Sequence, residues 1–241
     1  ETRRADLPAV LDVLRQILRE PTFPEPEFEI RRTQMLSALE KQLTDPQMLS
    51  QKAIQQIINP YPTDDPRYVP SYPENINRWK AVKQADLVKV YSEYLGGANG
   101  ELSVVGDFDP DQIRPLLDGL FAGWQASAHY ARLPKEGRIE LTSKHTDINT
   151  PDKENAVYFA ATVMPLSDTD SDYAPLVIGT DIFGGGGLSS RLGDRVRQEE
   201  GLSYGVGAFF SAQSLDERAT LGMYAIMNPQ NIAKVEAAIS E

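Results

Sequence analysis

The stretch FGGGGLSSRLGDRVRQEEGLSYGVG, residues 183–207, joins four consecutive glycines to a charged amphipathic segment and then to an alternating, strand-like run. The charged segment reads as a helix that places Leu192 and Val196 on one apolar face, and Gly201 ends it. This order is compatible with a phosphate loop, with a plain structural turn, or with a corner that grips a substrate. The rest of the chain decides between these three interpretations.

The glycine run lacks the features of a nucleotide-binding loop. Residues 184–187 form no G-x-G-x-x-G after a strand, and no Lys-Ser or Lys-Thr pair follows them. Four successive glycines also cost more backbone entropy than a simple connector requires. We therefore expect a loop that lets another chain approach the backbone closely, or that lets two parts of the molecule move.

The composition is typical of a soluble globular protein and argues against nucleic acid as a partner. The 241 residues are 41% hydrophobic and 24% charged, with a formal net charge of −11. Because phosphate backbones need a basic surface, we expect no nucleic-acid binding. No apolar run is long enough to predict a membrane span. The lack of cysteine excludes disulfides and thiolate metal ligands, and it fits the periplasm and the cytoplasm equally well.

Histidine chemistry is sparse. The two histidines, His129 and His145, lie in the region 125–151, which is poor in large apolar residues. No His-x-x-Glu-His or His-Glu-x-x-His pair occurs, and a catalytic zinc needs three protein ligands on preformed elements. We expect two exposed histidines, no metal site in this chain, and no hydrolytic site formed by this chain alone.

Residue periodicity predicts an α+β fold with mainly antiparallel strands. Helices are expected at 6–20, 28–43, 47–58, 77–79, 84–95, 110–121, 171–183, 189–200 and 229–241, and a proline-rich surface loop at 59–76. Strands are expected at 101–110, 138–141, 156–164, 202–211 and 218–227. The last two strands are joined by a short turn at 214–218, which favours antiparallel pairing over a doubly wound parallel sheet.

The chain is expected to hold parts of two domains. Residues 1–126 form the first part, 127–151 a linker and domain boundary, and 152–241 the second part. The sequence begins with Glu1 rather than Met and ends at Glu241 inside a helical pattern. We therefore expect a piece of a longer protein, cut at both ends.

Arg197 and Tyr204 lie on either side of the stop at Gly201. A helix that reverses into a strand at this glycine would bring the guanidinium and the phenol within reach of one target. The alternative is that Arg197 faces solvent or pairs with Glu200, and that Tyr204 fills the core.

Residues 184–212, GGGGLSSRLGDRVRQEEGLSYGVGAFFSA, resemble the Ser-Arg-Leu … Arg-Glu-x-x-Gly-Leu-x-Tyr signature of the pitrilysin or insulinase family of zinc peptidases, which includes the mitochondrial processing peptidases. A second stretch, LSVVGDFDPDQIRPLLDGLFAGW at 102–124, resembles the Val-Val-Gly-Asp strand and helix that close the family's first domain. The resemblance covers nearly the whole chain. It implies two α+β domains, each with a mainly antiparallel sheet flanked by helices.

The resemblance also implies roles for individual residues. In the family, an arginine and a tyrosine spaced by seven bind the substrate's backbone carbonyls and help to stabilise the oxyanion, and they match Arg197 and Tyr204. A flexible loop that contacts substrate in some members, or permits opening of the two halves, matches the glycine run: Gly184, Gly185, Gly186 and Gly187.

The zinc site does not carry over. The family's inverted His-x-x-Glu-His motif would precede this chain, and the third ligand, a glutamate in the long second helix, is matched by Ala38. Glu40 is two residues away, on a different helix face. The resemblance thus implies a degenerate, non-catalytic copy: zinc belongs to the parent assembly, in a catalytic half on the same or another chain.

The leading functional interpretation is the substrate-binding, non-catalytic half of a zinc metallopeptidase that encloses unfolded peptides. Such peptides are expected to lie as an added strand along a sheet edge. The resemblance favours the periplasm, where bacterial members often work, with the cytoplasm as the other option. An alternative is a structural or assembly subunit with no peptide-cleaving role. A third option, a fragment of a complete peptidase, would need an intact third glutamate.

Overall fold

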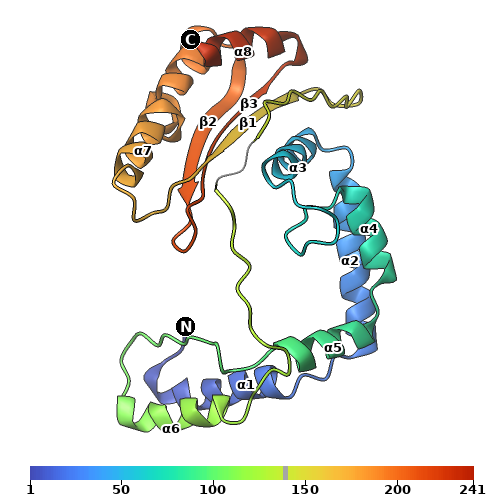
Figure 1. The fold of residues 1–241 in the computed structure, drawn as a ribbon, viewed down its shortest axis with the longest axis vertical. Coiled ribbons are helices and arrows are strands. Elements are labelled where there is room, and N and C mark those ends of the chain that lie inside the picture. The colour runs from blue at the N-terminus through green and yellow to red at the C-terminus, as the bar shows by residue number, and fades with distance from the viewer. Residues whose placement is uncertain (138–140) are drawn as a thin grey trace. The chain divides into compact units, whose positions relative to one another are not determined.

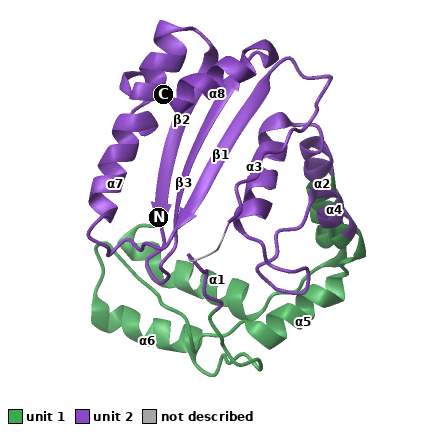
Figure 2. Ribbon diagram, turned by 45° about the horizontal axis from the view of Figure 1, so that its top comes forward, with its two compact units in different colours: residues 1–36, 78–132 green, residues 37–77, 133–241 purple. Residues whose placement is uncertain are grey.

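The computed structural model describes residues 1–137 and 141–241, which divide into two compact units. Residues 1–36 and 78–132 form the first unit, and residues 37–77 and 133–241 form the second (Figure 2). The helices α2 (Glu25–Gln42) and α4 (Tyr72–Ala81) each contribute residues to both units. The predicted linker and domain boundary at 127–151 stays a prediction. Each compact unit combines separate stretches of the chain, so the units do not test a single boundary along the sequence.

The described part of the first unit is built from helices α1 (Leu7–Arg19), α5 (Gln84–Tyr94) and α6 (Pro110–Phe121), with the start of α2. The Tyr91 hydroxyl donates to the Leu18 carbonyl at 2.7 Å, and its ring lies 5.6 Å from that of Phe23. Arg19 donates to the Leu120 carbonyl at 2.9 Å and so ties α1 to the end of α6. The bounds of α1, α5 and α6 confirm the helices predicted at 6–20, 84–95 and 110–121.

The predicted strand at 101–110 is wrong. Residues 101–108 are irregular, α6 begins at Pro110, and the Val105 side chain is 94% exposed. An alternating sequence forms a strand only where a neighbouring strand supplies hydrogen bonds. None of the strand pairs among the described residues includes this segment.

The sheet lies in the second unit and confirms the α+β class. Strands β1 (Ala156–Met164), β2 (Ser203–Ala212) and β3 (Ala219–Met227) form an antiparallel sheet in the order β1-β3-β2 (Figure 1). The turn between β2 and β3 is the one that the sequence predicts. Within the described sheet, β1 and β2 are therefore the edge strands. Helix α3 (Pro46–Ile58) packs beside β1 (Figure 2).

The two faces of this sheet differ. Side chains alternate between faces, and one face carries the buried residues Ala208, Ala225 and Met227. Helix α8 (Ile232–Ser240) and the helical turn η4 (Gly193–Glu199) cover that core face. The opposite face carries Phe159 and Phe209, whose rings lie 6.0 Å apart. We call this second face the open face, because Phe209 is exposed on it.

Three predicted elements differ in detail. The helix predicted at 77–79 is α4 and begins at Tyr72, because Glu74 accepts from the Ser71 amide and hydroxyl at 2.7 Å in a capping box. The helix predicted at 171–183 divides into α7 (Tyr173–Thr180) and a π-helical turn η2 (Asp181–Gly185). The helix predicted at 189–200 is largely the π-helical turn η4. Of the strand predicted at 138–141, residues 138–140 lie outside those described, and Leu141 belongs to no strand.

A buried arginine joins distant parts of the second unit. Arg218, which is 5% exposed, donates to the Glu136 carbonyl at 2.6 Å, the Ile58 carbonyl at 2.8 Å and the Asn59 side-chain oxygen at 3.0 Å. Burial lowers the pKa of Arg218. Gly137 packs directly against the backbone of Glu217, where a Cβ would collide with the carbonyl oxygen. The end of α3, the segment before residue 138 and the start of β3 are thereby held together.

Candidate functional site

The corner after η4 is built on one backbone hydrogen bond. Gly201 adopts a left-handed backbone with φ of 61°, which favours glycine, and the Leu202 amide donates to the Val196 carbonyl at 2.9 Å. Leu192 and Val196 are buried, as the sequence predicts. Arg197 directly follows Val196, and Tyr204 lies two residues after Leu202. The hydrogen-bonded reversal therefore sets both residues at the same corner.

Tyr204 is the extra residue of a β-bulge. Ser203 pairs with Met227 and Gly205 with Ile226, which leaves Tyr204 without a partner on β3. The Ser203 hydroxyl holds this irregularity: it lies 2.7 Å from the Gly205 carbonyl oxygen and 2.9 Å from that of Ile226, and it accepts from the Gly205 amide at 3.1 Å. Tyr204 is 63% exposed, so the alternative that Tyr204 fills the core is wrong.

The acidic residues around η4 are bound by a different arginine. Arg195 pairs with Glu200, with Glu241 at 2.7 Å and with Glu199 at 3.6 Å, and these carboxylates raise its pKa. Of the two alternatives for Arg197, pairing with Glu200 is therefore wrong, and exposure to solvent is what the structure shows. Arg197 is exposed, and within the described residues no carboxylate or carbonyl binds its guanidinium.

The glycine run is not the open loop that the sequence suggests. Gly184 and Gly185 belong to the turn η2, and Gly187 begins a short 3-10 turn, η3 (Gly187–Ser189). Gly184 is buried against β2, because a Cβ there would lie 2.6 Å from the Ala208 nitrogen. Gly185, Gly186 and Gly187 are exposed. A contact of these glycines with substrate stays a prediction.

The described residues do not fit a zinc site. No group of three or more His, Asp or Glu residues among them is arranged to hold a metal ion. Ala38 and Glu40 are exposed on α2 on either side of the buried Leu39. His129 and His145 are exposed, as expected, and His145 lies 3.1 Å from Asp147. We therefore assign no chemical step to zinc in this chain.

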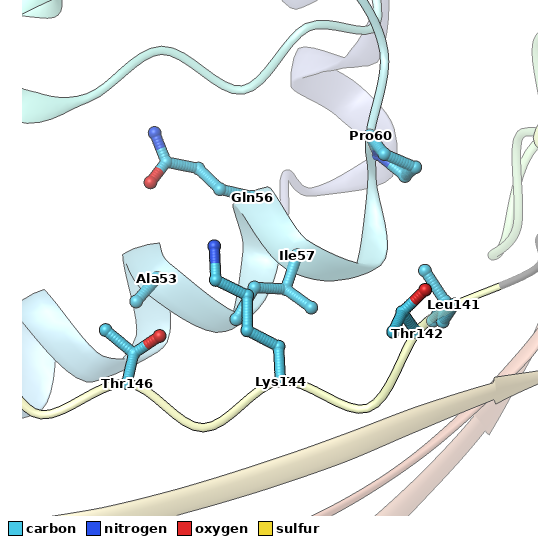
Figure 3. A pocket seen from close by; sticks show the side chains of 8 residues that line it. All are labelled: Ala53, Gln56, Ile57, Pro60, Leu141, Thr142, Lys144 and Thr146. Atoms are coloured by element: carbon cyan, nitrogen blue, oxygen red, sulfur yellow. The ribbon is translucent and has the colours of Figure 1, made fainter.

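A separate groove lies in the second unit between α3 and the extended segment that follows residue 140. Figure 3 shows the side chains that line it, which include one charged group, the Lys144 ammonium, and neither acid nor histidine. The lining residues are Ala53, Gln56, Ile57, Pro60, Leu141, Thr142, Lys144 and Thr146. This groove shares no residue with the corner at Arg197 and Tyr204, and it offers no acid–base pair.

Among the described helices, none is both long and apolar enough to cross a membrane.

Known proteins resemble the chain in fold and in part of its sequence. The family model described as the peptidase M16 inactive domain matches residues 81–241. The solved M16 inactive domain from Pseudomonas fluorescens superposes with a TM-score of 0.76 at 21% identity, covering 96% of this chain and 55% of that chain. A protease from Helicobacter pylori superposes with a TM-score of 0.72 at 15% identity, covering 98% and 57%. No curated protein sequence matches.

A third structure, the first half of the periplasmic protease PqqL from Escherichia coli, superposes with a TM-score of 0.61 at 15% identity, covering 99% of this chain and 50% of that chain. The chain thus spans about half the length of these structures. The family model includes η4 and all three strands, and so contains the whole corner around Gly201. The predicted resemblance is confirmed: the chain belongs to the peptidase M16 family, in the part described as the inactive domain.

Proposed function

We propose that this chain is the substrate-binding, non-catalytic half of an M16 zinc peptidase, and that Arg197 and Tyr204 bind the backbone of a peptide substrate. The observation that carries the proposal is that Arg197 and Tyr204 are both exposed and flank the hydrogen-bonded reversal at Gly201, and that no described residue binds the Arg197 guanidinium. Because Glu200 pairs with Arg195 and no other described carboxylate binds Arg197, the N–H donors of Arg197 are available to a ligand. The bulge turns Tyr204 away from the core at the same corner.

The two side chains supply hydrogen-bond donors and no acid–base chemistry. A guanidinium fork and a phenol hydroxyl can both donate to peptide carbonyl oxygens, and more strongly to an oxygen that gains negative charge during cleavage. The hydrolytic step itself belongs to a catalytic half that holds zinc. That half would lie on the same chain or on another one, and this chain alone would be inactive.

The test is turnover in the complete assembly with its catalytic half. Arg197→Ala and Tyr204→Phe are each expected to lower the turnover of an unfolded peptide by about 100-fold, the order of loss found when one oxyanion donor is removed. Arg191→Ala, at another exposed arginine of the same segment, serves as the matched control and should keep normal turnover. Normal turnover in both test variants would overturn the proposal and favour the structural-subunit alternative.

The proposal also places zinc outside this chain. Ala38 stands where the family resemblance expects the third ligand, and Glu40 is exposed on the same helix. Equilibrium dialysis of the purified chain against zinc should detect no stoichiometric binding. Binding that is lost in Glu40→Gln would instead assign this chain to a catalytic unit.

A periplasmic location is part of the same proposal. Its support is the similar structure that is named as a periplasmic protease. Fractionation of cells that carry the native gene would test it, and recovery of the protein with cytoplasmic markers would contradict it.

A further inference from the structure

Three residues around Arg197 on η4 are fastened to other parts of the second unit. Arg195 is bound by three carboxylates, and Val196 is completely buried in the core. Gln198 donates from its side-chain amide to the Leu188 carbonyl oxygen at 2.5 Å, ten residues earlier in the chain. Arg197 itself is exposed, and its guanidinium has no partner in the described part of the chain. The segment thus holds the backbone of Arg197 and leaves its side chain free.

Gln198 joins η4 to the turn that ends the glycine run. Gly187 begins this turn with φ of 66°, in the left-handed region that favours glycine. The Ser190 hydroxyl, which is almost fully buried, donates to the Gly187 carbonyl at 2.6 Å and accepts from the Gly193 amide at 3.1 Å. The carbonyl of Leu188, which Gln198 binds, is therefore presented by a turn that has its own hydrogen bonds.

The same turn also packs against the start of η4. A Cβ at Gly193 would collide with the Gly187 carbonyl oxygen, so the two backbones touch there directly. The turn η3 is thus tied to η4 at both ends, by backbone packing at Gly193 and by the Gln198 side chain next to Arg197. A π-helical turn such as η4 is rare and is frequently found at functional sites.

Resting on the proposed function, we propose that Gln198 is a positioning residue for Arg197. Its hydrogen bond to Leu188 holds the last turn of η4 and so orients the Arg197 guanidinium toward the substrate carbonyl. Donors act on a reacting group only when they are held in the productive geometry, and a misplacement of about 1 Å can cost about 100-fold in rate. The end of the glycine run then supports Arg197 from behind, and Gln198 itself does not touch the substrate.

The experiment measures kcat and KM separately for an unfolded peptide, in the complete assembly with its catalytic half. Gln198→Met keeps the length of the side chain and removes its N–H donor. Gln198→Lys supplies a donor that is long enough to reach the Leu188 carbonyl. Gln230→Met is the matched control, because Gln230 is exposed in the same unit and no described residue binds its side chain.

The expected result is that Gln198→Met lowers kcat by about tenfold and changes KM little, because the loss concerns an interaction made mainly in the transition state. Gln198→Lys should recover most of this loss, and Gln230→Met should behave as the wild type. In the presence of Arg197→Ala, the change Gln198→Met should have no further effect, because it acts through that arginine. The melting temperature of Gln198→Met should stay close to that of the wild type, since the side chain is exposed.

Three outcomes would contradict this inference. A normal kcat in Gln198→Met, together with a large loss in Arg197→Ala, would make the positioning role wrong while the proposed function stands. Losses that multiply in the double variant would mean that Gln198 acts independently of Arg197. Normal turnover in Arg197→Ala would remove that residue from the proposed function, and the role of Gln198 with it.

Discussion

Arg218 and Arg197 lie near opposite ends of β2 and have opposite surroundings. Arg218 precedes β3 beside the end of β2, is buried, and donates to three oxygens from distant parts of the second unit. Arg197 precedes the start of β2, is exposed, and has no partner among the described residues. A buried charge must have its hydrogen bonds satisfied, whereas an exposed one does not need them to fold. The first arginine therefore supports structure, and the second is free for a ligand.

Replacing each arginine by methionine tests this comparison most directly. Arg218→Met should lower the free energy of unfolding by about 3 kcal/mol, because the Ile58 and Glu136 carbonyls lose a charged donor inside the protein. Arg197→Met should change it by less than about 0.5 kcal/mol. Urea unfolding followed by circular dichroism measures both values. Equal losses would remove the distinction between the two arginines.

The glycine run contains the same contrast between a packed and a free position. Gly184→Ala should cost about 1–3 kcal/mol, because its Cβ would press on the Ala208 nitrogen and methyl group. Gly185→Ala is the matched control, since its nearest contact is a side-chain oxygen of Asp181 at 3.3 Å. Thermal unfolding of both variants should show a clear loss for the first and little for the second. A loss at Gly185 as large as that at Gly184 would mean that the run packs as one unit.

The Ser203 hydroxyl stabilises the bulge at the start of β2, and its removal tests how much that bulge depends on it. Ser203→Ala removes the hydroxyl that bonds the Gly205 amide and lies beside the Ile226 carbonyl, so we expect a loss of about 1 kcal/mol in stability. Hydrogen exchange should also become faster at the Gly205 amide while the amides of β3 stay protected. Unchanged exchange at Gly205 would show that the bulge does not depend on this hydroxyl.

The smallest expected effect is the loss of stability at low pH that comes from the ion pair of Asp65 and Arg67 in the second unit. Arg67 binds Asp65 through two nitrogens, at 2.7 and 3.0 Å, and these hydrogen bonds lower the pKa of Asp65 to about 2. Because the folded pKa lies below the ordinary value of 3.8, the pair stabilises the fold above that value and loses its contribution as the pH falls through about 2.

Asp65→Asn should therefore have a lower melting temperature than the wild type at about pH 6. The two melting temperatures should converge at about pH 2, where Asp65 becomes protonated in the folded wild type. Thermal unfolding across this range measures the difference. A gap between the two curves that persists at the lowest pH would show that the pair acts through hydrogen-bond geometry and not through the charge of Asp65.

Local signals in the sequence predict most of the elements but not the strand pairing. Apolar spacing predicts α1 and α3. The Ser71-x-x-Glu74 capping box that starts α4 is visible in the sequence, but the prolines before it and within it favour a loop prediction. The segment around Val105 has the alternation of a strand and still forms none. A partner strand is a property of the whole fold, so alternation alone does not decide the outcome.

The sequence suggests the residues of the proposed site, whereas their local geometry depends on the fold. The spacing of Arg197 and Tyr204 is visible in the sequence, and the pairing of Arg195 with Glu199 follows from the helical i,i+4 rule. The bulge that exposes Tyr204 depends on the register between β2 and β3, which no local pattern specifies. The burial of Arg218 depends in the same way on residues that lie far away in the sequence.

The free edge of β2 has a consequence for how the chain behaves in solution. A strand edge that no described strand covers can pair with the edge of a second copy, which is the first step of strand-to-strand aggregation. The bulge at Tyr204 interrupts the regular ladder at one end and shortens the stretch over which two copies can zip together to residues 205–212. The irregularity that exposes the phenol of Tyr204 thus also limits, at this end of β2, the length of strand that a second copy can pair with.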